Sequence, residues 1–377
     1  MAVQRLRDFS DPARCARLVV KIGSALLVDP GGKPRGSWLR SIASEIAGAR
    51  ARGQEVIVVS SGSIAMGAAQ LGLPGGGRET LSQAQAAAAV GQVQLASLWA
   101  NTLGEHDLQS GQMLLTLEDM ESRTRYLNAR NTLRELLDRG VVPIVNENDS
   151  VATSEIRFGD NDRLAARVAQ AADANGLLLL TDVDGLYSAN PDQPHAKLLP
   201  EVHGVTDEIR AMATGGSGSG IGSGGMTSKL QAAEIAERAG IALGIIRGTQ
   251  DSPIGRAMDT GRGTLFRPVR DDNAFKSWIG GRMRFGGSVQ VDDGAARALG
   301  DGSSLLAIGV TKVIGTFDRG DVISIEDAEG RMIAKGMTEY SSAQCDAIKG
   351  LRSEAVAAKI GHVPRSAVVH RDQMVML

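Results

Sequence analysis

The sequence predicts a doubly wound α/β fold with a mostly parallel sheet, followed by a smaller β-rich domain. Over roughly the first 265 residues, short apolar runs alternate with helical patterns, which is typical of βαβ units. From about Phe285 onward, short runs separated by Gly and Asp turns replace that alternation. A chain of 377 residues is also long for one hydrophobic core. We therefore expect a first domain over 1–266, a linker over 267–285, and a second domain with a C-terminal tail over 286–377.

Six apolar runs in the first domain predict strands. Each run is almost continuously apolar, as expected of strands that are buried on both faces of a parallel sheet. The predicted strands are Leu18–Ile22, Val56–Val59, Met113–Leu115, Val141–Val145, Leu177–Leu180 and Ala242–Ile246.

Helical stretches lie between these runs. Gly53, Gly140 and Gly240 follow three of the stretches, where glycine suits the C-terminal cap of a helix. The Ala- and Gln-rich segment 82–96 has high helix propensity and predicts a packing helix. The predicted helices cover about 38–52, 82–104, 128–139, 160–175 and 226–239.

In the second domain, short apolar runs between Gly and Asp turns predict a small β-rich fold. The runs are Ser288–Val291, Leu305–Ile308, Val322–Ile325 and Ala367–Val369.

Composition excludes several classes of protein. Apolar residues make up 42% of the chain and charged residues 22%, which is ordinary for a soluble globular protein. A formal net charge of −2 gives no reason to expect a polyanionic partner. Cys15 and Cys345 cannot form a disulfide framework. The apolar run Leu18–Val28 is too short for a membrane span and is interrupted by Lys21, so we expect a cytoplasmic protein that does not enter the membrane.

Polar residues follow directly on four of the predicted strands. They are Lys21, Ser60-Ser61-Gly62, Asn146–Asp149 and Thr181-Asp182. The carboxyl ends of parallel strands meet at one edge of a sheet, where ligands of such folds bind. The sequence therefore predicts one shared site at that edge.

Two lysines and an acidic region between them indicate phosphoryl transfer. Lys21 closes the apolar run Leu18–Val20, and Lys229 opens a helical pattern after the glycine-rich segment 215–225. The clusters Asn146–Asp149 and Gly159–Asp162 lie between them. Cations and carboxylates of this kind serve metal-assisted phosphoryl transfer, because charge must be neutralised on the moving group. The glycine-rich segment by itself is either a flexible linker or a nucleotide-binding lid.

The order Ser228-Lys229-Leu230 differs from the Gly-Lys-Ser/Thr order of a P-loop, so another kinase family is indicated. Seven motifs together carry a resemblance that covers nearly the whole chain. They are 20–24 (VKIGS), 59–65 (VSSGSIA), 146–151 (NENDSV), 158–162 (FGDND), 180–182 (LTD), 185–187 (GLY) and 224–230 (GGMTSKL).

Through these motifs the chain resembles the glutamate 5-kinase family (the γ-glutamyl kinases), a branch of the amino-acid kinase family that often carries a C-terminal PUA domain. The resemblance implies an amino-acid-kinase-like sheet domain followed by a PUA-like domain. It also implies phosphorylation of the side-chain carboxylate of L-glutamate by ATP with Mg²⁺. The product is L-glutamyl 5-phosphate, and the reaction is the first step of proline biosynthesis.

The resemblance assigns roles to individual residues. Lys21 and Lys229 would contact the transferring phosphoryl group, and Asp162 would orient both lysines. The residues implied to bind glutamate are Ser61, Asp149 and Asn161, and Asp160 is a candidate for holding Mg²⁺. The residues implied to bind the nucleotide are Lys21, Thr181, Asp182, Ser223, Gly224, Gly225, Met226, Thr227, Ser228 and Lys229.

Two alternative functions stay open at this point. The same fold could phosphorylate another small carboxylate or a nucleoside monophosphate. A PUA domain could instead bind RNA, although residues 282–377 carry twelve basic and twelve acidic residues and so lack the basic excess typical of such a surface. The resemblance further implies proline as a feedback inhibitor, glutamyl-5-phosphate reductase as a functional partner, and a homo-oligomer.

Overall fold

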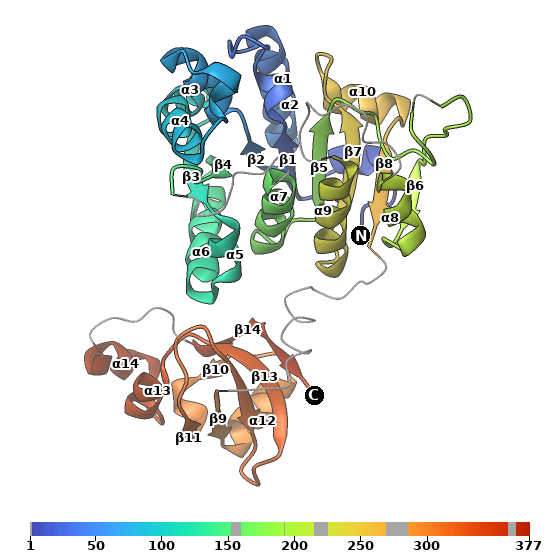
Figure 1. Ribbon diagram of the computed structural model, residues 1–377. Coiled ribbons are helices and arrows are strands. Elements are labelled where there is room, and N and C mark those ends of the chain that lie inside the picture. Colours follow the sequence, from blue (N-terminus) through green and yellow to red (C-terminus); the bar gives the residue numbers. More distant parts are fainter. Residues whose placement is uncertain (1, 152–159, 192, 215–224, 269–285, 361–366) are drawn as a thin grey trace. The chain divides into compact units, whose positions relative to one another are not determined.

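The computed structural model describes residues 2–151, 160–191, 193–214, 225–268, 286–360 and 367–377 (Figure 1). The chain forms two compact units, Met1–Asp271 and Asp272–Leu377. The predicted linker over 267–285 lies outside the described residues except for its first two positions.

Among the described residues, the first unit has an eight-stranded sheet in the order β3-β4-β2-β1-β5-β7-β8-β6. Neighbours from β3 to β7 pair in parallel, β8 is antiparallel to β7, and β6 is parallel to β8. The prediction of a mostly parallel sheet is confirmed, as are all six predicted strands. The strands are β1 (Arg17–Ile22), β2 (Glu55–Ser60), β3 (Ser110–Leu115), β4 (Val142–Glu147), β5 (Gly176–Thr181), β6 (Glu201–His203), β7 (Ala242–Arg247) and β8 (Thr264–Arg267).

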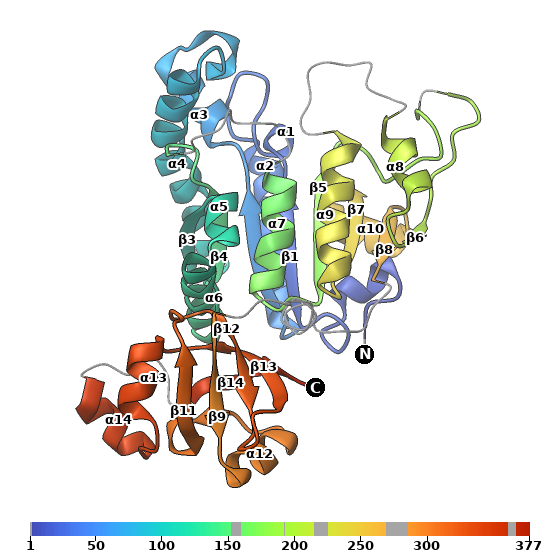
Figure 2. The same ribbon diagram turned by 60° about the horizontal axis from the view of Figure 1, so that its bottom comes forward.

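Helices cover both faces of this sheet. Leu18 and Val20 of β1 belong to one hydrophobic core, whereas Val19 between them belongs to the other. Successive side chains of a strand point to opposite faces, so each central strand contributes to both cores. Side chains of three helices complete the first core: α2 (Gly36–Ala51), α4 (Leu81–Gly104) and α10 (Pro253–Thr260). Three others complete the second core: α6 (Arg123–Asp138), α7 (Asp160–Ala171) and α9 (Met226–Arg238). Figure 2 shows α7 and α9 side by side over their face.

The five predicted helices are confirmed, with ends that differ by a few residues. Gly53, Gly140 and Gly240 follow α2, α6 and α9 with φ of +87°, +76° and +68°, as a C-terminal cap requires. No helix among the described residues has the length and hydropathy that a membrane span needs. The helices of this unit are η1 (Leu6–Ser10), α1 (Ser24–Leu27), α2 (Gly36–Ala51), α3 (Ser63–Leu71), η2 (Pro74–Gly77), α4 (Leu81–Gly104), α5 (Leu117–Glu121), α6 (Arg123–Asp138), α7 (Asp160–Ala171), α8 (Asp207–Thr214), α9 (Met226–Arg238) and α10 (Pro253–Thr260).

Helices α3 and α4 approach each other closely because glycine lies at their contact. A Cβ atom at Gly67 would lie 1.8 Å from the carbonyl oxygen of Ala87, and one at Gly91 would lie 1.8 Å from that of Ser63. Both distances are far below van der Waals contact. Any side chain at either position must therefore separate the two helices.

We expect Gly67→Ala to lower the free energy of unfolding by about 3 kcal/mol, the upper end of the usual cost of overpacking, because the clash is with backbone. Urea unfolding measures this change. The matched control is Gly104→Ala at the end of α4, where a Cβ would meet nothing within 4 Å. We expect that control to be neutral or to stabilise the protein by up to about 1 kcal/mol. If Gly67→Ala and the native protein have the same free energy of unfolding, the close contact between α3 and α4 is contradicted.

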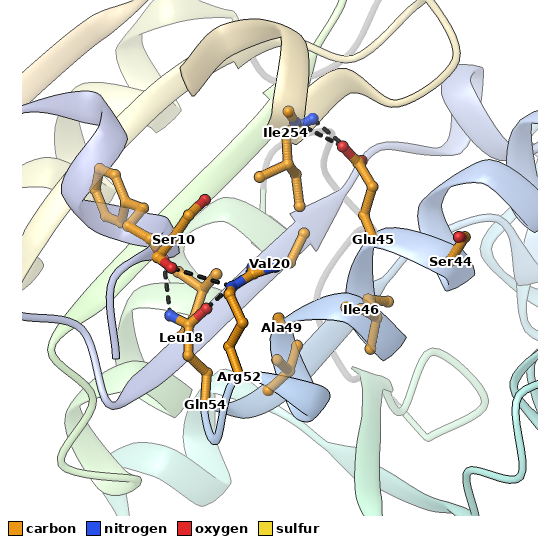
Figure 3. A pocket seen from close by; sticks show the side chains of 14 residues that line it. Ser10, Leu18, Val20, Ser44, Glu45, Ile46, Ala49, Arg52, Gln54 and Ile254 are labelled. Carbon is orange, nitrogen blue, oxygen red and sulfur yellow. Dashed lines mark hydrogen bonds between the residues drawn. The ribbon is translucent and has the colours of Figure 1, made fainter. Parts of the chain in front are cut away.

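A pocket near the amino ends of β1 and β2 is bordered by side chains that hold neighbouring elements together (Figure 3). The carboxylate of Glu45 accepts hydrogen bonds from the backbone N–H groups of Ile254 (3.2 Å) and Gly255 (2.6 Å) at the start of α10. Burial raises the pKa of Glu45 despite these bonds. Arg52 donates to the carbonyl of Ser10, and Gln54 donates to that of Phe9. These contacts fix α10 and η1 against α2, so we assign the pocket a structural role.

The second unit is β-rich, as predicted, with a six-stranded sheet in the order β10-β14-β13-β12-β9-β11 among the described residues. The prediction of a strand over Leu305–Ile308 is wrong after Leu306, because the chain turns there into a short 3-10 helix that packs Gly309 against Ala295. The elements are β9 (Gly287–Val291), α12 (Asp293–Gly300), β10 (Leu305–Leu306), η3 (Ala307–Gly309), β11 (Val310–Gly315), β12 (Val322–Glu326), β13 (Met332–Thr338), α13 (Ser342–Ile348), α14 (Ser353–Ile360) and β14 (Ala367–Met376).

Candidate active site

The parallel register places the polar strand ends at one edge of the sheet. Lys21 of β1 lies opposite Val59 of β2 on one side and Leu179 of β5 on the other. The residues that follow these strands therefore come together with Lys21. They are Ser61 after β2, Asn148 and Asp149 after β4, and Asp182 after β5.

A buried group of three charges lies at this edge. One carboxylate oxygen of Asp162 is 2.5 Å from Nζ of Lys21, and the other is 3.2 Å from Nζ of Lys229. Asp162 is 1% exposed, Lys21 8% and Lys229 5%. Lys21 comes from β1, Asp162 from the first turn of α7 and Lys229 from the first turn of α9. We call these three residues the ion triad.

The ion triad carries more positive than negative charge. Burial by itself would raise the pKa of Asp162, but the charges of Lys21 and Lys229 and their hydrogen bonds hold it below its ordinary value. Asp162 is therefore ionised at neutral pH, and one carboxylate faces two ammonium groups. The remaining positive charge makes the site attractive to an anion such as phosphate.

The first turn of α9 adds further donors for an anion. Gly225 precedes this helix as its N-terminal cap, and glycine has no side chain that could bond the first N–H groups. The hydroxyl of Ser228 donates to Asp162 at 3.1 Å. Free backbone N–H groups and the helix dipole favour negative charge at a helix N-terminus. Met226 and Thr227 belong to the same turn, so the described part of the predicted nucleotide segment begins at this helix end.

The turn from β2 into α3 presents Ser61 to the site. Gly62 has a φ of +118°, a conformation that glycine adopts readily and other residues rarely. The backbone N–H of Ser61 donates to the carbonyl of Ile22, which ties the turn to β1. The Ser61 hydroxyl accepts a hydrogen bond of 2.7 Å from Nδ2 of Asn161. Ser61 and Asn161 are thus in direct contact, one residue away from the ion triad.

A buried polar network continues from Asn161. Its Nδ2 also donates to Oδ1 of Asn146 at 3.3 Å. Nδ2 of Asn146 in turn donates to Oε1 of Gln92 at 2.7 Å and to the Ser63 hydroxyl at 3.2 Å. The Ser63 hydroxyl donates to Asp149 at 3.4 Å. The three residues predicted to bind glutamate therefore lie in one connected network.

The sequence did not single out Gln92, Ser63 or Asn146 as individual site residues. A signal for Gln92 existed, because Ala84, Ala88, Gln92 and Leu95 follow helical spacing and all are buried. An amide on a buried stripe of alanine and leucine needs a partner. The helix was expected only to pack.

Some of the predicted residues lie outside the polar network, and others lie outside the described residues. Thr181 ends β5, and its hydroxyl donates to the Asp182 carboxylate at 2.9 Å. Ser223 and Gly224 lie outside the described residues. Asp160 is the first residue of α7, and its side chain is outside what the structure describes.

No group of three or more His, Cys, Asp or Glu side chains within the described ranges could enclose a metal ion. Mg²⁺ is commonly held by substrate phosphates, water and one or two carboxylates rather than by a protein cage. A single carboxylate candidate, Asp160, is compatible with that mode of binding.

Two protein-family models match the chain. The model of the amino acid kinase family matches residues 16–247, and that of the PUA domain matches residues 287–360. A glutamate 5-kinase of Novosphingobium aromaticivorans is 60% identical over the full length of both chains. The chain belongs to the glutamate 5-kinase family. Relatives of the same name include that of Sphingopyxis alaskensis (55% identical, covering 97% of this chain and 99% of the relative) and that of Zymomonas mobilis (51%, covering 97% and 92%).

Proposed function

We propose that this protein transfers the γ-phosphoryl group of ATP to the side-chain carboxylate of L-glutamate. The products are ADP and L-glutamyl 5-phosphate, and the reaction begins proline biosynthesis. The full-length identity with glutamate 5-kinases supports the substrate. The observation that carries the chemistry is the ion triad, in which one buried carboxylate holds two lysines at the edge of the sheet.

The chemistry requires little proton transfer. The side-chain carboxylate of glutamate is ionised at neutral pH, so it attacks the γ-phosphorus without a general base. A bond forms between that carboxylate oxygen and phosphorus while the bond from phosphorus to the ADP oxygen breaks. Catalysis then depends on in-line positioning and on neutralising the phosphoryl oxygens.

We assign these tasks to residues by their contacts. Lys21 and Lys229 neutralise charge on the transferring group, and Asp162 holds their ammonium groups in place. Ser61, Asp149 and Asn161 bind glutamate within the polar network. The nucleotide binds to Lys21 of β1, to Thr181 and Asp182 at the end of β5, and to the segment 223–229 that leads into α9. Mg²⁺ arriving with the nucleotide would supply further positive charge, and Asp160 would be the candidate carboxylate for it.

The first expected result is formation of an acyl phosphate from L-glutamate, ATP and Mg²⁺. Hydroxylamine converts an acyl phosphate into a stable hydroxamate, which can be quantified. Aspartate and N-acetylglutamate serve as competing acceptors in the same assay. Release of ADP measures phosphorylation of a nucleoside monophosphate, whose product is not an acyl phosphate. Efficient phosphorylation of one of these acceptors but not of glutamate would refute the substrate assignment.

We also expect proline to inhibit the enzyme and glutamate to relieve that inhibition. Proline has an α-amino and an α-carboxylate group, so Asp149 and Asn161 can bind it in the same way, but it lacks the carboxylate that accepts the phosphoryl group. Initial rates across proline concentrations at several glutamate concentrations measure the effect. Rates that do not respond to proline would exclude this regulation. The loop over 150–156, which we expect to modulate it, lies outside the described residues from 152 onward.

Three further proposals follow from the same assignment. The enzyme acts in the cytoplasm, it passes its reactive product to glutamyl-5-phosphate reductase, and it works as a homo-oligomer. RNA binding is not favoured, because the second domain has no basic excess.

A further inference from the structure

Gln92 has a buried polar atom that the folded chain leaves unsatisfied. Its side chain is 9% exposed, and Oε1 accepts a hydrogen bond from Asn146. Nε2, by contrast, has no hydrogen-bond partner among the described residues. A buried donor without a partner costs about 1–3 kcal/mol, so natural proteins rarely keep one without a function. Gln92 lines a pocket together with Ser63, Asn148 and Asp149.

A second unsatisfied atom lies at the opposite end of the same network. Oδ1 of Asn161 is buried and has no hydrogen-bond partner in the described part of the chain. Asn161, Asn146 and Gln92 are joined in series, and each amide donates to the oxygen of the next. We call these three side chains the amide series.

The three amides share one polarity, and Ser63 sets it, because its hydroxyl donates to the Asp149 carboxylate and therefore accepts from Asn146. Two amides in contact must place N–H against oxygen, since two oxygens or two NH₂ groups would repel each other. The direction of one amide therefore sets the direction of all three. One end of the series offers a free acceptor, Oδ1 of Asn161, and the other offers a free donor, Nε2 of Gln92.

A ligand at the Gln92 end must accept a hydrogen bond from Nε2, and the carboxylate of Asp149 in the same pocket favours a ligand that also carries a positive charge. The α-ammonium and α-carboxylate groups of an amino acid have this pair of properties and are attached to the same carbon. Asp149, in the same network, adds a negative charge that suits the ammonium group.

We propose that Gln92 is a substrate-binding residue that donates a hydrogen bond from Nε2 to the α-carboxylate of the amino-acid substrate, while Asp149 in the same pocket binds its α-ammonium. This inference rests on the proposed function and identifies which groups of glutamate bind Gln92 and Asp149. The side-chain carboxylate of glutamate is left to point toward Lys21 and Lys229.

Gln92→Glu tests the inference with a minimal change of shape. The new carboxylate still accepts from Asn146, but it replaces the free donor by an acceptor that repels an α-carboxylate. The assay uses hydroxylamine trapping with two substrates, L-glutamate and L-isoglutamine, in which a carboxamide replaces the α-carboxylate. An α-carboxamide can donate to the new carboxylate, so the variant discriminates between the two substrates.

For Gln92→Glu we expect KM for glutamate to rise by about 10- to 100-fold, the range for a lost hydrogen bond to a charged group. We expect KM for isoglutamine to stay equal or fall, and KM for ATP to stay within about twofold because Gln92 lies away from the phosphoryl group. A merely structural role would raise KM for both substrates alike, and that result would overturn the inference. An unchanged KM for glutamate would show that water satisfies Nε2 and would also overturn it.

Gln94→Glu on the same helix is the matched control, since Gln94 donates to Gln70 and lies outside the amide series. We expect it to leave both KM values unchanged. If Gln92→Glu does not fold, Gln92→Ala replaces it, and KM should rise more for glutamate than for isoglutamine, because a hydrogen bond to a charged group is the stronger one. Native protein that forms no hydroxamate from glutamate would overturn the proposed function and this inference together. If the native protein phosphorylates glutamate but the Gln92 variants keep the native KM for glutamate, the inference alone is overturned.

Discussion

Replacing either lysine of the ion triad by methionine should lower kcat by about 10²- to 10³-fold, the loss typical of removing one group that stabilises transition-state charge. Methionine keeps most of the aliphatic stem, so packing is retained while the ammonium group is lost. Asp162 keeps one cationic partner in either single variant, because it contacts Lys21 through one oxygen and Lys229 through the other. We therefore expect Lys21→Met and Lys229→Met to fold and to lose turnover.

Steady-state kinetics with hydroxylamine trapping measures this effect, and thermal unfolding checks the fold. Lys197→Met is the matched control, since Lys197 is exposed and lies outside the candidate site. KM for glutamate should change little in the two triad variants, because its ligands lie in the polar network. A folded Lys229→Met enzyme with native kcat would refute the catalytic assignment.

The sheet of the first unit was predictable because its central strands are buried on both faces. Val19, Val20 and Ile22 are fully buried in β1, so the run reads as continuously apolar. The short strands β6 and β8 escaped prediction because three or four residues give no periodicity. In the second unit β11 also escaped, since it is largely exposed and shows no alternation between apolar and polar residues.

The residues of the candidate site were predictable where polar side chains lie at the end of a strand. Lys21 and the segment after β4 were found because parallel strands end at one edge. Asp162 and Lys229 are 67 residues apart in the sequence, and the resemblance brought them together before the structure did. Gln92 was not found, because its role depends on Asn146, which is 54 residues away and on another element. A contact of this kind leaves no local pattern in the sequence.

Asp162→Asn should lower the free energy of unfolding at neutral pH by about 3–5 kcal/mol, the usual cost of breaking a buried ion pair. The variant keeps the shape of the side chain but leaves two buried ammonium groups without their carboxylate. ATP should restore part of the loss, because its phosphates supply negative charge to both lysines and it binds only the folded state. The matched control is Asp173→Asn. Asp173 also contacts two arginines, Arg130 and Arg134, but is partly exposed, so we expect a loss of at most about 1 kcal/mol.

The pH dependence of this difference provides a second test. The pKa of Asp162 is lowered in the folded protein, so its contribution to stability is present above the unfolded-state pKa of about 3.9. That contribution is lost as the pH falls through the folded-state pKa, when the carboxylate becomes protonated. Urea unfolding from pH 7 to pH 3 should therefore show the largest gap between native protein and Asp162→Asn at neutral pH, and the gap should begin to narrow below about pH 4. A gap that stays constant over this range would mean that Asp162 stabilises the fold through its shape rather than its charge, and the ion triad would not be the electrostatic centre of the site.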